Sequence, residues 1–312
     1  MEKKRSLAPE FFIAGAQKCG TTALYSYLRT HPRIALSVRK EPYFWSTDLH
    51  PRGAITDADE YARLWEGAPV DALRGEATPA YIRSAVAIPN ILRERPDARF
   101  ILLIRNPVAM AASLHAQLVY SQDEDEPYFE KAWRLQAARR GGEHLPPRCS
   151  DPTKLQYERV CALGDQLERF TGLIPEANQL VLFSEDMAAD PRAVYQRTLA
   201  FLGLPDDGRL AFERVNENWN QRSRRLTRFH RRLPQRLGRL YGPLRALAAR
   251  FGVRPTAMVR RLNFAQGPRG RLDPRFDAEL VAAFRPQVLK IEALTGRDLS
   301  HWKRAGGARA AP

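Results

Sequence analysis

Short, uninterrupted apolar runs alternate along the chain with longer segments in which apolar residues recur every three or four positions. Phe11–Gly15, Arg99–Ile104 and Gln179–Phe183 are runs of the first kind. Such runs are typical of parallel strands that are buried on both faces, whereas the longer spacing is typical of helices with one apolar face. The alternation predicts an α/β protein with a P-loop-like, three-layer fold, in which a central, mostly parallel sheet is flanked by helices.

Proline, glycine and capping residues mark the remaining boundaries. We expect two further strands, at residues 33–37 and 71–77. The expected helices cover residues 21–28, 57–65, 84–95, 154–170, 190–202 and 273–294, and one more begins at Asn106-Pro107. The acidic stretch 121–127 is expected to be a solvated surface turn, and residues 141–152 an irregular segment.

Composition limits the class of protein. A chain of 312 residues with 44% hydrophobic content can bury a full core, so we expect a single domain over residues 1–312 with a frayed tail at 305–312. The sequence contains no apolar run long enough for a membrane span and no signal region, which favours a cytoplasmic protein. Three cysteines at unrelated spacings predict free thiols rather than a disulfide framework or a zinc site.

The formal net charge of +15 has a local origin. Residues 222–271 contain fifteen arginines and no acidic residue, and without them 35 basic residues face 35 acidic ones. Leucine and phenylalanine recur through this segment at helical spacing, so we expect a helical, Arg-rich insertion. Its Arg face is either simply solvated or attracts an anionic acceptor or a membrane surface.

The first apolar run leads into a glycine-flanked loop and then a helix. Gly20, Thr21 and Thr22 would lie at the helix N-terminus, where unpaired N–H groups favour an anion such as a phosphate. The spacing Gly15-x-x-x-x-Gly20 is close to a P-loop, but the lysine is inside the loop, at Lys18, and not after the second glycine. The loop is therefore not a Walker A motif. The alternative to an anion-binding loop is an ordinary strand-to-helix turn.

Two more places combine residues that could take part in chemistry. Glu41 lies between Lys40 and an aromatic stretch, which suits proton transfer, or else forms a solvated charge pair. Arg105 follows a buried strand, and Ser113 lies about two turns into the next helix. An arginine and a hydroxyl suit a second phosphate, while a salt bridge and an ordinary helical serine are the alternative.

The loop sequence GAQKCGTT resembles the 5′-phosphosulfate-binding loop of sulfotransferases that use 3′-phosphoadenosine 5′-phosphosulfate (PAPS). Three other stretches resemble motifs of the same family: Lys40–Phe44 the segment carrying the catalytic base, Glu76–Tyr81 the E-K-[ST]-P-A-Y segment, and Arg105 to Ser113 the 3′-phosphate motif. The closing Gly296–Trp302 is similar to bacterial members.

The resemblance implies a role for each matching residue. Lys18 and Glu41 would be catalytic, Lys18 stabilising the leaving group and Glu41 acting as the base. The 5′-phosphate would be held by Lys18, Cys19, Gly20, Thr21 and Thr22, and the 3′-phosphate by Arg105 and Ser113. No metal is expected. If Glu41 is not the base, His115 is the next candidate.

Three positions depart from the family pattern. Ala77 replaces a lysine, Tyr43 replaces a histidine, and Met110 replaces an arginine. These departures leave the PAPS assignment intact and make the acceptor uncertain.

The resemblance implies sulfuryl transfer from PAPS to a hydroxyl, in preference to an amine, of a carbohydrate, lipid or small-molecule acceptor. A peripheral membrane contact stays open, and nucleic acid is not an expected partner. Two other functions remain as alternatives. One is a P-loop kinase or NTPase, and the other is a non-enzymatic binder of nucleic acid or anionic membrane through the Arg-rich segment.

Overall fold

The computed structural model describes residues 6–49, 51, 53–213, 219–221, 264–266 and 272–306. The chain divides into two compact units. The first unit comprises the described parts of residues 1–111, 158–215 and 273–312, and the second those of residues 112–157 and 216–272. Most of the Arg-rich insertion predicted at 222–271 lies outside the described residues, as does the tail from residue 307.

A five-stranded, all-parallel sheet forms the centre of the first unit. Its spatial order is β2-β3-β1-β4-β5. The strands are β1 (Phe11–Gly15), β2 (Ile34–Leu36), β3 (Leu73–Ala77), β4 (Arg99–Ile104) and β5 (Gln179–Phe183). All five lie within or next to the segments predicted as strands, and the predicted α/β class with a parallel sheet is confirmed.

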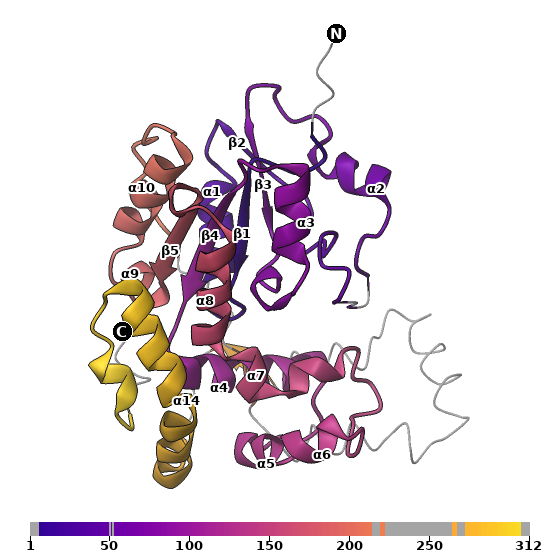
Figure 1. Cartoon of the computed structure of the whole chain (residues 1–312), viewed down its shortest axis with the longest axis vertical. Helices are drawn as coiled ribbons and strands as arrows, with labels where there is room; N and C mark the ends of the chain where they lie inside the picture. The colour runs from indigo at the N-terminus through magenta and orange to yellow at the C-terminus, as the bar shows by residue number, and fades with distance from the viewer. Residues whose placement is uncertain are drawn as a thin grey trace. The chain divides into compact units, whose positions relative to one another are not determined.

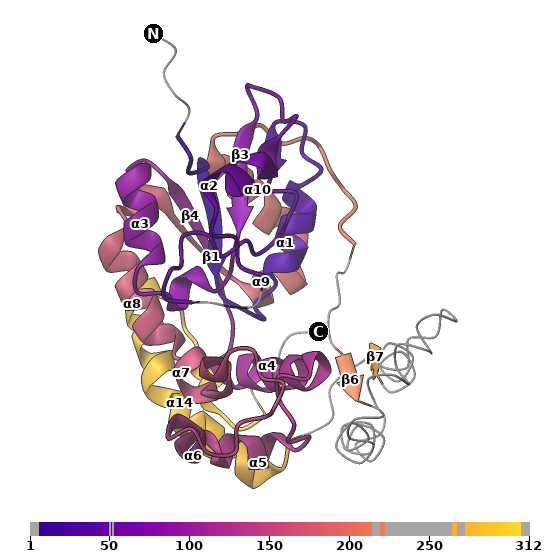
Figure 2. The ribbon, with the colours of Figure 1, turned by 90° about the vertical axis from the view of Figure 1, so that its right-hand side faces the viewer.

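Helices cover both faces of this sheet (Figures 1 and 2). One face is covered by α1 (Thr21–Leu28) and α10 (Pro191–Leu202), and the other by α3 (Ala87–Glu94) and α8 (Leu163–Leu173). The long helix α14 (Pro274–Thr295) packs against α8. The first unit also contains the short helices α2 (Ala58–Ala62) and α9 (Ser184–Ala189), and α4 (Pro107–Ser121) begins in it.

The helix boundaries follow the capping residues that the sequence indicates. The Asn106 side chain accepts hydrogen bonds from the N–H groups of Val108 and Ala109, at 2.9 and 3.3 Å, and so caps α4. Asp190 caps α10 in the same way, and Asp273 caps α14. Both of these helices end at a glycine with positive φ, which satisfies the last carbonyls.

The closing segment packs onto α9 through charged groups. Arg297 donates two hydrogen bonds of 2.6 Å to the Asp186 carboxylate and lies over the Phe183 ring. The indole N–H of Trp302 donates to Glu185. The stretch that resembles bacterial sulfotransferases at the C-terminal end therefore anchors α9, which follows the edge strand β5.

The second unit contains the rest of α4, with α5 (Phe129–Arg134), α6 (Gln136–Arg140) and a two-stranded antiparallel ribbon of β6 (Trp219–Gln221) and β7 (Phe264–Gln266). A buried ion pair joins Glu124 to Arg139 at 2.6 Å. Burial raises the pKa of the Glu124 carboxyl, but hydrogen bonds from Arg139 and Tyr157 outweigh it and hold that pKa below its usual value. The prediction that residues 121–127 form a solvated turn is therefore wrong at Glu124.

The helix predicted over residues 154–170 is also wrong in its extent. The chain forms a 3-10 turn (Pro152–Leu155), the short helix α7 (Tyr157–Val160) and then α8. The break lies at Cys161 and Ala162, where Ala162 has a ψ of 62°, outside the helical region, and the Leu163 N–H bonds to the Cys161 carbonyl at 2.8 Å. Within α8, a Cβ on Gly164 would lie 2.6 Å from the Gln287 carbonyl of α14, so this glycine allows the two helices to pack closely.

Gly75 of β3 lies directly against the side chain of Phe11. A Cβ at this position would lie 2.2 to 2.7 Å from ring atoms of Phe11, which is fully buried on β1. We expect Gly75→Ala to lower the free energy of unfolding by about 1–3 kcal/mol, because the ring cannot move without disturbing the core. Urea unfolding checks this.

Gly172→Ala is the matched control. Gly172 lies in α8, and a Cβ there would meet nothing within 4 Å. Alanine is the better helix former, so this variant should be neutral or more stable by up to about 1 kcal/mol. Equal effects of the two substitutions would contradict the packing argument.

Candidate functional site

The candidate site lies at the edge of the sheet where the parallel strands end. The chain leaves β1 toward β2 on one side of the sheet and leaves β4 toward β5 on the other, so the connections diverge between β1 and β4. Ligands of open α/β sheets bind at such a switch point. The loop after β1 and the residue after β4, Arg105, are both at this position.

The loop after β1 has an unusual backbone that leads into α1. Gly20 is the N-cap of α1 with φ 96°, a left-handed conformation that glycine adopts without strain, and no side chain caps the helix there. Lys18 has φ 64°. Thr21 and Thr22 occupy the first turn of α1, so their N–H groups are at the positive end of the helix dipole. The arrangement can hold a phosphate.

Arg105 joins this loop from the end of β4. Its guanidinium donates to the Lys18 carbonyl at 3.3 Å. The thiol of the next residue, Cys19, is fully buried, and burial raises its pKa to about 12, although the charges of Arg105 and Lys18 lower it. Cys19 therefore shapes the loop as a small apolar residue and is not a nucleophile.

Glu41 is tied to the loop through a lysine. Lys40 Nζ donates to Thr22 Oγ1 at 2.9 Å and to Glu41 Oε1 at 3.2 Å. The Tyr43 hydroxyl donates to the other carboxylate oxygen, Oε2, at 3.1 Å. The Glu41 side chain is about one-third exposed, so a substrate can reach a carboxylate whose orientation is set by two donors.

The structure thus brings the predicted residues of the first unit to one edge: Lys18, Cys19, Gly20, Thr21, Thr22, Glu41 and Arg105. Ser113 lies on α4 beyond residue 111, where the second unit begins. His115, the alternative base, also lies in the second unit, where its ring contacts Phe129 and Tyr157 and its Nε2 is 2.9 Å from the Glu126 carbonyl. It is buried, unlike Glu41.

Glu76 begins the stretch that resembles the E-K-[ST]-P-A-Y segment, but sequence reasoning gave it no role of its own. It lies on β3, one position before its end, and its side chain is fully buried. Burial raises the pKa of its carboxyl to about 7, although hydrogen bonds from Thr78, Tyr61 and Tyr81 lower it. The only indication in the sequence is a glutamate near the end of a predicted strand. Its position alone does not show that the side chain is buried.

A pocket of about 380 Å³ lies beside the segment that carries Glu41. Its lining includes the aromatic residues Tyr43, Phe44 and Trp45, and Asn90 and Arg93 of α3. The Asn90 side chain donates to the Trp45 carbonyl at 3.1 Å. Tyr43 belongs both to this lining and to the hydrogen bonds of Glu41. The volume of the pocket lies in the range of small-molecule sites.

Comparison with known proteins identifies the family. Residues 8–232 match the model of the sulfotransferase domain. Heparan sulfate glucosamine 3-O-sulfotransferase 6 of Homo sapiens is 30% identical over 196 residues, which cover 63% of this chain and 52% of that protein. Heparan sulfate glucosamine 3-O-sulfotransferase 3A1 of Mus musculus is 29% identical over the same length, with 46% of that protein covered.

A solved structure covers nearly the whole chain. The crystal structure of a sulfotransferase from Alicyclobacillus acidocaldarius superposes with a TM-score of 0.68 at 26% identity, over 95% of this chain and 99% of the other. The chain belongs to the sulfotransferase domain family, so the resemblance recognised from the sequence is confirmed. The family transfers sulfuryl groups and uses PAPS as donor.

The match to the curated relatives is partial. The chain spans about half the length of those proteins. In the described part of the chain, no helix is both long enough and apolar enough to cross a membrane.

The buried Glu76 predicts an unusual dependence of stability on pH. Its carboxyl has a pKa of about 7 in the folded protein, against an ordinary value of 4.5. Between these values the folded state holds a proton that the unfolded state has lost, so stability falls as pH rises from about 4.5 to 7. Relative to Glu76→Gln, wild type should lose up to about 3 kcal/mol of unfolding free energy across this window.

Urea unfolding of both proteins at pH 5 and pH 8 measures this change. The difference between them should shift in favour of the glutamine variant at pH 8. A difference that is the same at both pH values would show that Glu76 titrates normally.

Proposed function

We propose that this chain transfers the sulfuryl group of PAPS to an acceptor hydroxyl, with Glu41 as the general base. The observation that carries the proposal is the bridge made by Lys40, which contacts Thr22 of the phosphate loop and Glu41 together. A base that removes the acceptor proton must lie beside the bound donor, and this bridge holds the two parts together.

Each end of the nucleotide has its own set of groups in this proposal. Lys18 and the backbone from Gly20 to Thr22 bind the 5′-phosphate at the N-terminus of α1. Arg105 and Ser113 bind the 3′-phosphate, which separates PAPS from nucleotides without that group.

In the chemical step, Glu41 takes the proton of the acceptor hydroxyl as its oxygen attacks the sulfur. A new S–O bond to the acceptor forms, and the bond from sulfur to the bridging oxygen of the 5′-phosphate breaks. Lys18 stabilises the negative charge that grows on that bridging oxygen, which leaves as part of 3′-phosphoadenosine 5′-phosphate (PAP). The products are the acceptor sulfate ester and PAP.

The pocket beside Tyr43 supports an acceptor with a ring. Aromatic lining residues favour stacking with a sugar or an aryl ring, and Arg93 adds a positive charge to the lining. A carbohydrate, a glycolipid head or a small phenol fits this description. In this proposal the reaction takes place in the cytoplasm. A contact with an anionic membrane would be made by the Arg-rich segment at 222–271.

A transfer assay with sulfur-labelled PAPS tests the function. The acceptors are chitobiose, octyl β-glucoside and 2-naphthol, which represent a carbohydrate, a lipid-like glycoside and a phenol. We expect labelled product from at least one of them in the presence of EDTA. If none is sulfated and PAP leaves the melting temperature unchanged, the proposal is wrong.

Lys18→Ala should reduce turnover far more than it weakens PAP binding, because its main contact forms as the leaving group gains charge. We expect kcat to fall by roughly 10²–10³-fold. Arg105→Ala is the contrasting variant, since the 3′-phosphate takes no part in bond breaking. Its lost charged hydrogen bonds, about 1.5–3 kcal/mol, should weaken PAP binding roughly ten- to a hundredfold.

Calorimetric titration with PAP and initial-rate kinetics give both quantities, with Lys290→Ala as a surface control. Equal losses of PAP affinity and kcat in the Lys18 variant would show that Lys18 acts only in binding.

Glu41→Gln should keep the shape of the site and lose the base. PAP affinity should therefore survive, while kcat falls by roughly 10²–10⁴-fold. Glu60→Gln, an exposed change on α2, is the matched control and should keep full activity. Normal kcat in the Glu41 variant would assign the base to another residue.

A further inference from the structure

Glu76 is a buried carboxylate whose named hydrogen-bond partners are hydroxyl groups. Thr78 donates to Oε1 at 2.6 Å, Tyr61 donates to Oε2, and the Tyr81 hydroxyl is bonded to the same carboxyl. Burying a carboxylate is costly even when it is hydrogen-bonded, and the chemistry proposed above does not use this one. Such a group needs an explanation.

The hydrogen bonds continue from Glu76 to the segment that carries Glu41. The Tyr61 oxygen accepts a hydrogen bond from Trp45 Nε1 at 2.7 Å, and the Tyr81 oxygen accepts one from the Trp45 backbone N–H at 3.3 Å. Both N–H groups of Trp45 are therefore bound by tyrosines that also contact Glu76. Phe44 stacks on the Tyr61 ring, with centroids 4.2 Å apart.

The carboxylate sets the direction of these hydrogen bonds. Above a pH of about 7, where this carboxyl is ionised, it only accepts, so each tyrosine must point its proton at Glu76 and its lone pairs elsewhere. The lone pairs are then available to the two N–H groups of Trp45. A neutral amide at position 76 would offer a donor on one side, and one hydroxyl would have to reverse.

The segment from Lys40 to Trp45 needs such an anchor because its backbone is strained. Glu41 and Tyr43 have φ values of 63° and 61°, in the left-handed region that side chains disfavour. Glu41 N–H is bonded to the Ala77 carbonyl at 2.9 Å, directly after Glu76 in β3.

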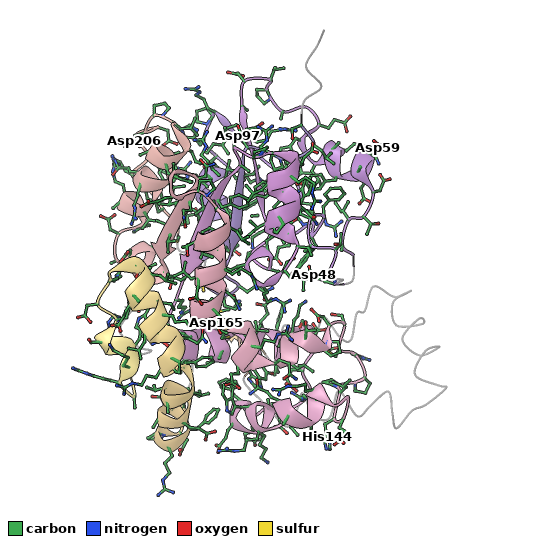
Figure 3. The ribbon with its side chains drawn as sticks, in the orientation of Figure 1. Asp48, Asp59, Asp97, His144, Asp165 and Asp206 are labelled. Atoms are coloured by element: carbon green, nitrogen blue, oxygen red, sulfur yellow. The ribbon has the colours of Figure 1, made fainter. Side chains whose placement is uncertain are left out.

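The segment is also held beyond Trp45. The carboxylate of Asp48, which is labelled in Figure 3, accepts hydrogen bonds from Ser84 and from the N–H of Ala85, just before α3. The strained stretch is therefore held at Glu41 by the Ala77 carbonyl and beyond Tyr43 by the anchors at Trp45 and Asp48, of which the nearer one is centred on Glu76.

We propose that Glu76 is a positioning residue for sulfuryl transfer, which acts through Tyr61 and Tyr81 on Trp45 and so holds the Glu41 carboxylate at the acceptor. The inference rests on the proposed function, because it takes Glu41 as the base. Glu76 does not touch the substrate, and its effect is on the placement of Glu41 and of the aromatic pocket wall.

Glu76→Gln tests the proposal in the transfer assay, with the panel acceptor that gives the highest rate. A small displacement of a catalytic group is costly, so kcat should fall by roughly ten- to a hundredfold. The dissociation constant of PAP should stay within about twofold, because the substitution acts on Trp45 and leaves Lys18, Arg105 and the backbone of Gly20 to Thr22 in place. A purely structural role would lower the melting temperature but would not lower kcat while the dissociation constant of PAP stays unchanged.

Trp45→Phe is the second variant, since it keeps the ring and removes the Nε1–H donor. It should also lower kcat, and the double variant should be less impaired than the product of the two single effects, because both act on one network. Thr198→Val in α10 is the control for the loss of a buried hydrogen bond, which Thr198 makes to the Val194 carbonyl. Its kcat should equal that of wild type.

Two outcomes separate this inference from the proposed function. If wild type transfers sulfuryl groups and both Glu76→Gln and Trp45→Phe match its kcat, Glu76 only stabilises the fold and the inference is wrong. If wild type neither binds PAP nor transfers, the proposed function is wrong, and the positioning role is overturned with it.

Discussion

β1 pairs with β3 on one side and with β4 on the other, and this pairing fixes the relative positions of the phosphate loop, Arg105 and Glu41 at the carboxyl ends of the strands. The register places Ile13 opposite Ala77 and Gly15 opposite Leu102, and Ala16 N–H bonds to the Leu103 carbonyl. The phosphate loop and Arg105 are thereby fixed to adjacent strands. Because the Glu41 N–H bonds to the last residue of β3, the candidate base is held by the same sheet.

Two glutamates near this edge show how environment divides roles between identical side chains. Glu41 is partly exposed and bonded to a lysine and a phenol, so it can meet a substrate. Glu76 is fully buried among hydroxyls, and its carboxyl has a raised pKa of about 7. The first suits proton transfer, and the second suits holding polar groups in one direction.

Much of the fold and of the site could be predicted because the signals are local. Apolar runs identify the strands, and Asn106, Asp190 and Asp273 mark helix starts. The displaced Lys18 distinguishes the loop from an ATPase loop within a few residues. Each of these depends on neighbours in the sequence.

The features that sequence reasoning missed depend on contacts between distant residues. Glu124 reads as part of a solvated acidic stretch, yet Arg139 and Tyr157 bury it. The helix expected over residues 154–170 breaks at Ala162, and α8 then packs at Gly164 against α14, more than a hundred residues later. Glu76 gains its importance from Tyr61 and Trp45, which no spacing rule connects to it.

The central claim is that this edge binds a nucleotide with both a 5′- and a 3′-phosphate and needs no divalent metal to do so. Isothermal titration with PAP, 5′-AMP and ATP, once in EDTA and once with Mg²⁺, tests it most directly. The account predicts that PAP binds at least about tenfold more tightly than 5′-AMP, as expected for one added set of charged hydrogen bonds, and more tightly than ATP. Equal affinity for PAP and 5′-AMP, or tight binding of ATP that requires Mg²⁺, would contradict it.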